Sequence, residues 1–161
     1  MAITAMEILE RCRRAGADTQ RLREKIGMFR DAAGRMTSSI DGVGSRSTGE
    51  SDHMATLMGE IDEVERQLRQ REREYAVEIS AACQLLDALP PMECQVMNRY
   101  YVRRETLNAI AVGMGYSYSY VRTLKTSGRN ALRQVPEGTV ARMLPEWYME
   151  TTDKKSQKRQ R

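Results

Sequence analysis

The sequence predicts an all-α protein made of a long N-terminal helical hairpin and a compact helical domain that follows it. Apolar residues recur every three to four positions along two long, highly charged segments, as they do in helices with one buried face. The pair Pro90 and Pro91 then ends the second segment, because proline removes a backbone donor and disfavours helical geometry in the residue before it. A chain of 161 residues has room for one ordinary domain, or for a small domain on a long arm.

The arm is expected to span residues 1–89 and to begin with a helix from about Thr4 to Arg35. Its apolar positions are spaced mostly three or four apart, and they are Ile8, Leu9, Cys12, Leu22, Ile26 and Phe29. Gly16 interrupts this pattern, so the segment predicts either one helix or two short ones that meet there. Residues 37–52 are dominated by Gly and Ser, which indicates a flexible connection too polar to pack.

The second arm helix is expected from His53 to Leu89. A seven-residue spacing, typical of a coiled-coil-like seam, links Ile61, Leu68, Tyr75, Ala82 and Leu89. Arg71 and Glu78 break the companion row of the seam, so the coiled coil is imperfect. This helix can pack back on the first one within the chain or form an oligomeric seam, and a dimer is the favoured oligomer.

The ionisable side chains offer no catalytic or metal-binding cluster. The three cysteines are far apart in the sequence and His53 is the single histidine, so neither a zinc site nor a histidine-based triad can be assembled from them. The sequence also lacks a phosphate-binding loop and a dinucleotide fingerprint. We therefore expect no enzyme, no cofactor and no metal, and buried thiols in a reducing compartment.

Positive charge is concentrated in one segment of the chain. Residues 1–98 carry 13 Lys/Arg and 17 Asp/Glu, whereas residues 99–133 carry 7 basic residues and the single acid Glu105. The remaining residues have 6 basic and 4 acidic side chains, and the three parts add up to the net charge of +4. A local basic surface of this kind is typical of proteins that face phosphate groups.

The basic segment contains the pattern of a helix-turn-helix within residues 90–135. In the stretch from Leu107 to Thr126, apolar residues fall where two crossing helices bury their inner faces, Ala111 is the small residue at the crossing, and Gly115 is the turn. Thr106 and Ser117 can cap the first and second helix with their hydroxyls. The alternative is an ordinary helical hairpin that packs on the arm without touching nucleic acid.

The second motif helix carries polar side chains on its outward face. The candidates for reading base edges are Tyr118, Ser119, Tyr120, Arg122, Thr123 and Thr126. Arg122 suits a bidentate contact to guanine, although a phosphate contact is equally open for it. The candidates for phosphate contacts are Arg103, Arg104, Ser117, Lys125, Arg129 and Arg133.

The stretch from Leu89 to Val135 resembles region 4 of bacterial sigma factors, in which a helix with an "LP...VL.LRY" pattern precedes the helix-turn-helix. In sigma factors this region recognises the promoter −35 element, and the resemblance places that role on Tyr118, Ser119, Tyr120, Arg122 and Thr123. The acidic pair that is usual in the first motif helix is here Asn108 and Ala109.

The order of a charged arm, a Ser/Gly loop, a second long helix and a sigma-like domain is similar to phage late-transcription regulators of the RinA/ArpU type. This resemblance implies a phage or prophage activator that binds double-stranded DNA in the cytoplasm of a bacterial host, with RNA polymerase as a further partner. The rival is a phage small terminase subunit that recognises packaging DNA as an oligomeric ring. A third possibility is a module that uses its sigma-like domain on protein.

The last part, residues 136–161, is expected to be an extension with a disordered tail. Five of its last eight residues are basic, which suits either non-specific DNA binding or solubility. No apolar run in the chain approaches the roughly 20 residues that cross a bilayer, and the N-terminus lacks the order of charges in a signal peptide. We expect no membrane association.

Overall fold

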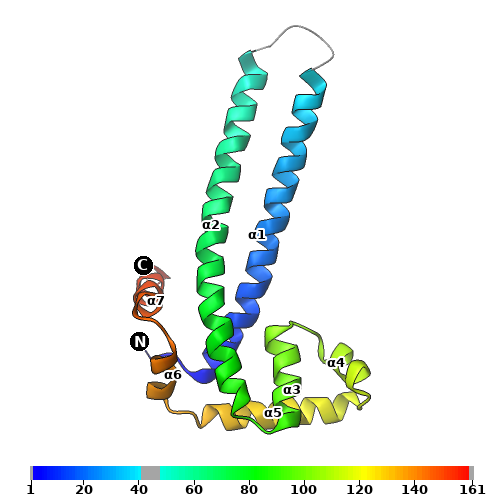
Figure 1. Ribbon diagram of the computed structural model, residues 1–161, viewed down its shortest axis with the longest axis vertical. Helices are drawn as coiled ribbons and strands as arrows, with labels where there is room; N and C mark the ends of the chain where they lie inside the picture. The colour runs from blue at the N-terminus through cyan, green and yellow to red at the C-terminus, as the bar shows by residue number, and fades with distance from the viewer. Residues whose placement is uncertain (1, 41–47, 160–161) are drawn as a thin grey trace. The chain divides into compact units, whose positions relative to one another are not determined.

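The computed structural model describes residues 2–40 and 48–159, and within these ranges it is helical and contains no strand. The all-α prediction is therefore confirmed. Two long helices come first, α1 (Ala5–Ile40) and α2 (Thr48–Asp87). The shorter elements that follow are α3 (Pro91–Met97), the π-helix η1 (Asn98–Val102), α4 (Leu107–Met114), α5 (Tyr118–Arg133), α6 (Glu137–Met143) and α7 (Glu146–Arg159), as Figure 1 shows.

The chain divides into two compact units. The first contains residues 1–16 and 74–161, and the second contains residues 17–73. The ends of both long helices thus belong to the same unit as α3 to α7. The division therefore lies within the two long helices, whereas the predicted boundary lies between residues 89 and 90.

The second unit is the long helix pair, in which the middle parts of α1 and α2 lie side by side (Figure 1). Ile26 of α1 and Ile61 and Val64 of α2 are buried in it. Arg23 pairs with Glu72 at 2.6 Å, one of the ion pairs that join the two helices. Such exposed pairs contribute at most about 1 kcal/mol each, so the apolar contacts hold the hairpin.

The helices extend further than the sequence indicated. α1 runs through Gly16 without a break, and it continues to Ile40 within the predicted loop. There the hydroxyls of Thr37 and Ser38 donate to the carbonyl oxygen of Gly34, at 2.8 and 3.0 Å, so these residues satisfy their polar groups within the helix. Since α2 begins at Thr48, the remaining loop residues, 41–47, lie outside the described residues.

The larger apolar core of the first unit draws on distant parts of the chain. Ile8 and Leu9 of α1 and Leu86 of α2 are buried in it together with Tyr101 of η1 and Leu132 of α5. Residues of α6 and α7 complete the core, namely Val140, Leu144 and Tyr148. None of the helices described is long and apolar enough to cross a membrane.

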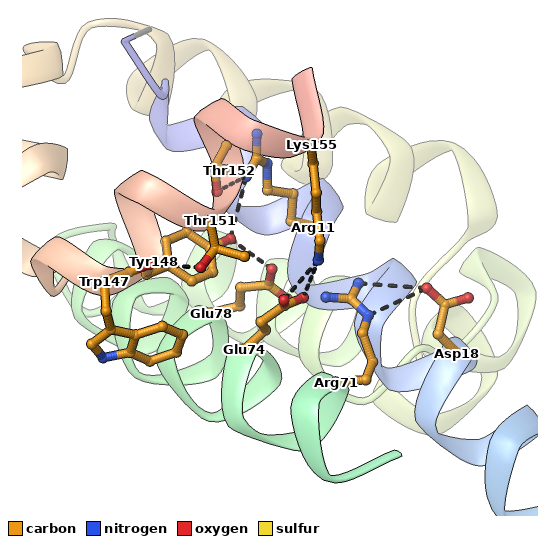
Figure 2. A network of polar contacts seen from close by, with 10 residues as sticks. All are labelled: Arg11, Asp18, Arg71, Glu74, Glu78, Trp147, Tyr148, Thr151, Thr152 and Lys155. Atoms are coloured by element: carbon orange, nitrogen blue, oxygen red, sulfur yellow. Dashed lines mark hydrogen bonds and ion pairs between the residues drawn. The ribbon is translucent and has the colours of Figure 1, made fainter. Parts of the chain in front are cut away.

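Buried polar side chains attach α7 to the two long helices (Figure 2). The hydroxyl of Tyr148 donates to Glu78 Oε1 of α2 at 2.6 Å, and Arg11 of α1 donates to the same hydroxyl at 3.4 Å. Further along α7, Lys155 Nζ lies 2.6 Å from the carboxylate of the buried Glu74. Buried carboxylates need such partners, because an unpaired buried charge is strongly destabilising.

The basic tail differs from the prediction of disorder. Asp153 to Arg159 form the last turns of α7, and only residues 160–161 lie outside the described part. Lys155 pairs with the buried Glu74, and this contact gives the segment a fixed partner. Composition alone does not predict such a contact.

The buried Tyr101 predicts how stability depends on alkaline pH. Burial raises the pKa of Tyr101 to about 12, and the Glu10 carboxylate acts in the same direction. Because the folded-state pKa lies above the unfolded value of about 10, this stabilisation is complete below pH of about 10 and is lost as pH rises towards about 12. Thermal unfolding measured at both ends of this pH range gives the stability that each protein loses as the pH rises. This loss should be smaller for Tyr101→Phe than for the wild type.

Tyr118→Phe is the control for this measurement, because the Tyr118 side chain is 47% exposed. It should lose as much stability with pH as the wild type does. Equal losses for Tyr101→Phe and the wild type would contradict a buried neutral phenol.

Candidate DNA-binding interface

α4 and α5 are joined by a tight turn whose local geometry is set by three residues. The Thr106 hydroxyl accepts from Ala109 N at the start of α4, and the Ser117 hydroxyl accepts from Tyr120 N at the start of α5, each at 3.2 Å. Gly115 ends α4 with φ of 72°, a left-handed conformation that glycine adopts at no steric cost. Both predicted caps and the predicted turn glycine are confirmed.

A second, small apolar cluster holds the two motif helices against α3. Its buried residues are Val96, Ile110, Ala111, Val121 and Leu124. One helical turn beyond Leu124, Gly128 lies so close to α3 that a Cβ atom there would be 2.9 Å from Met97 Cγ. Ala111, the predicted small residue at the crossing, is buried here, whereas the apolar Met114 of the motif is only partly buried.

The single acid of the basic segment is neutralised within the domain. Arg99 Nε donates to both carboxylate oxygens of Glu105, at 3.1 and 3.0 Å, and its Nη2 lies 2.8 Å from Oε2. The same guanidinium covers Gly113 of α4, where a Cβ would come within 2.5 Å of it. No Asp or Glu occurs from Thr106 to Pro136, so the motif contributes positive charge and no carboxylate of its own. The Glu93 carboxylate of α3 accepts from the hydroxyl of Ser127 in α5 at 3.3 Å.

The outward face of α5 is exposed and polar. All six residues predicted to read bases are exposed, which are Tyr118, Ser119, Tyr120, Arg122, Thr123 and Thr126. The opposite side of α5 is buried through Val121, Leu124, Gly128 and Leu132. This division leaves one solvent-facing surface on α5. The major groove of DNA is wide enough to admit an α-helix with such a surface.

Two hydroxyls on this face donate hydrogen bonds to carbonyl oxygens of α5 itself. Thr123 Oγ1 donates to the carbonyl oxygen of Ser119, and Thr126 Oγ1 donates to that of Arg122, each at 3.0 Å. Their oxygen atoms keep lone pairs towards solvent, so each threonine can act as a hydrogen-bond acceptor without leaving the helix.

The predicted phosphate contacts differ in their surroundings. Arg103 and Arg133 are exposed, as a phosphate contact requires. Lys125 is half-buried, with Nζ 3.7 Å from the centroid of the Tyr100 ring, and Ser117 uses its hydroxyl as the cap of α5. Arg129 is half-buried as well.

Arg104 has an unusual backbone. It is the one non-glycine residue with positive φ in the described ranges, at 60°, and it lies in the connection between η1 and α4. Its side chain packs on Gly16 of α1, where a Cβ would be 2.9 Å from Arg104 Cδ and Nε. No pattern in the sequence indicates this contact, because a glycine within a helix is compatible with many kinds of surroundings.

Comparison with known protein families finds a match to the family described as Sigma-70, region 4, over residues 85–134. Residues 85–134 form a Sigma-70 region 4 domain. This is a DNA-binding domain of the helix-turn-helix type, and the exposed α5 face is its second motif helix. The region 4 domain covers α3 to α5 and starts inside the last turn of α2. Comparisons with curated proteins and with solved structures find no match.

The turn glycine of the region 4 domain gives a stability prediction. Replacing Gly115 by Ala should lower the free energy of unfolding by roughly 1 to 2 kcal/mol, because an L-residue is strained at this φ. Nothing lies within 4 Å of the added Cβ, so the effect is conformational and involves no clash.

Urea unfolding measures this change, and Gly138→Ala in α6 is the matched control. Gly138 also has open space around its Cβ position, and its φ is not positive. The control should therefore leave stability unchanged or raise it slightly. A Gly115→Ala protein as stable as the wild type would show that the turn does not need a left-handed residue.

Proposed function

We propose that the chain is a sequence-specific transcription regulator that inserts α5 into the major groove of double-stranded DNA. One observation carries the proposal: an exposed α5 face without acidic residues, on a domain that matches Sigma-70 region 4. A helix of this kind fits the major groove and can reach base edges there. No catalytic role is proposed for any residue.

Arg122 and the α5 hydroxyls are proposed to read the bases. The exposed Arg122 guanidinium can donate two hydrogen bonds to O6 and N7 of guanine. Thr123 and Thr126 offer oxygen acceptors, which suit the amino groups of adenine or cytosine, while their methyl groups suit the thymine methyl. Ser119 adds a hydroxyl to the same face, and Tyr118 and Tyr120 can reach base edges or the sugar-phosphate backbone.

Phosphate contacts are proposed for the basic residues around this face. Arg103 and Arg133 are the most accessible of them. Arg104, Lys125 and Arg129 would add positive potential from partly buried positions. Ser117 lies at the start of α5, where backbone N–H groups and the helix dipole favour an anion.

Selection of binding sites from a pool of random duplexes tests the proposal. The wild type should enrich one sequence, and Arg122→Ala should bind that sequence about 5- to 150-fold more weakly, as expected for a lost base contact of 1 to 3 kcal/mol. The loss should shrink when the contacted guanine is replaced. Arg142→Ala removes an exposed charge of α6 and should have a small effect on both sequences.

A failure to enrich any sequence would refute sequence-specific binding by this domain. Equal losses for Arg122→Ala on the enriched and the replaced sequence would instead assign Arg122 to a phosphate.

The acceptor role of Thr123 has its own test. Thr123→Val keeps the branched shape and removes the oxygen, whereas Thr123→Ser keeps the oxygen and removes the methyl group. If the oxygen accepts from a base amino group, Val should lose about fivefold or more in affinity for the selected site and Ser should lose less. The reverse order would indicate a contact with the thymine methyl.

The finer role that we propose is activation of late genes by a phage or prophage regulator of the RinA/ArpU type in a bacterial host, with RNA polymerase as a partner. The helix pair of residues 17–73 is proposed to form a dimer, and the exposed side chains of Met28 and Met58 support an apolar contact there. A dimer presents two recognition helices to two half-sites.

Mass measurement of the full chain in solution distinguishes the candidates. A dimer agrees with the regulator, and a ring of eight or more chains would favour the alternative, a phage small terminase subunit that recognises packaging DNA. A monomer at micromolar concentration would contradict both oligomeric proposals.

A further inference from the structure

Arg13, on the first long helix, contacts the backbone that leads into the DNA-binding motif. Its guanidinium Nη1 donates to the carbonyl oxygen of Tyr100 in η1, and to that of Glu105 at 3.4 Å. Tyr100 lies in η1, and Glu105 lies in the connection of residues 103–106 that leads into α4. Carbonyls at a helix end lack partners within the helix, and a guanidinium carries five donors in a rigid fork that can serve two of them.

The Tyr100 ring continues this contact to the recognition helix. Arg13 Cζ lies 4.0 Å from the ring centroid, and Lys125 Nζ of α5 lies 3.7 Å from it. Tyr100 also packs against both apolar clusters of the unit. The ring therefore joins α1 to α5 through two cation–π contacts as well as through its own packing.

A second contact, between Gly16 in the next turn of α1 and Arg104, holds the connection between η1 and α4. Arg104, in its left-handed conformation, lays its side chain on Gly16, three residues after Arg13. Residues three apart share one face of a helix, so Arg13 and Gly16 form a continuous surface against the connection. A strained residue persists where its surroundings over-determine it, and this surface supplies part of that constraint.

We propose that Arg13 is a positioning residue for DNA binding: it holds the η1–α4 connection, and through Tyr100 and Lys125 the helix α5, in the orientation that reads the groove. The inference rests on the proposed function, since it assumes that α5 reads DNA. It assigns to the charged arm a part in recognition that does not require the arm to touch DNA.

The test compares Arg13→Ala with Arg14→Ala in the full chain. Arg14 is the exposed neighbour on the same helix, so both variants lose one positive charge from one place. Affinity for the selected duplex and for an unrelated duplex is measured over a series of salt concentrations. Arg13→Ala should lose about tenfold for the selected duplex, as expected when hydrogen bonds from a charged group are removed.

The salt series separates positioning from direct contact. A lost phosphate contact reduces the slope of log affinity against log salt by about 1. For Arg13→Ala the slope and the affinity for the unrelated duplex should match those of Arg14→Ala, so that only the ratio of selected to unrelated binding falls. A reduced slope relative to Arg14→Ala would overturn the proposal in favour of a phosphate contact.

Arg13→Lys keeps the inference testable if the Ala variant does not fold. Lysine retains the charge near the Tyr100 ring but has no planar fork, so it should show a smaller loss of the same ratio. A folded Arg13→Lys or Arg13→Ala protein with the wild-type ratio would overturn the positioning role. A wild-type protein that prefers no sequence would instead refute the proposed function on which the inference rests.

Discussion

The burial of one side of α5 is the constraint on which the rest of the first unit depends. Near its start, Val121 and Leu124 enter the small cluster with α3 and α4, and near its end Leu132 enters the larger core with the ends of the long helices. A helix buried along one stripe must expose the opposite one. The same apolar contacts that fold the unit therefore fix which residues of α5 face solvent.

Charge makes that exposed stripe suitable for nucleic acid. The Arg99–Glu105 pair neutralises the acid next to the motif, and the rest of the motif has none. Meanwhile the carboxylates buried elsewhere in the unit, Glu74 and Glu78, pair with Lys155 and Tyr148. These acids have partners away from the outward face of α5, and the basic residues Arg103, Arg122 and Arg133 remain exposed.

Local signals in the sequence were sufficient for the motif and insufficient for its surroundings. Thr106, Gly115 and Ser117 act on residues a few positions away, so their roles could be predicted from turn and capping chemistry alone. Lys155 and Glu74 are 81 residues apart, and Arg13 and Tyr100 are 87 apart. No periodicity or spacing reports contacts at such separations, so the sequence pattern does not predict the helical tail or the contacts of Arg13.

Chemical footprinting of the bound duplex tests most directly whether α5 reads the major groove. Dimethyl sulfate modifies guanine at N7 in the major groove and adenine at N3 in the minor groove, and these atoms are the base-edge acceptors of the two grooves. On the selected sequence, the wild type should protect guanine N7, and Arg122→Ala should lose protection at one guanine while the others remain. Protection confined to adenine N3, or an unchanged pattern with Arg122→Ala, would contradict recognition through this face of α5.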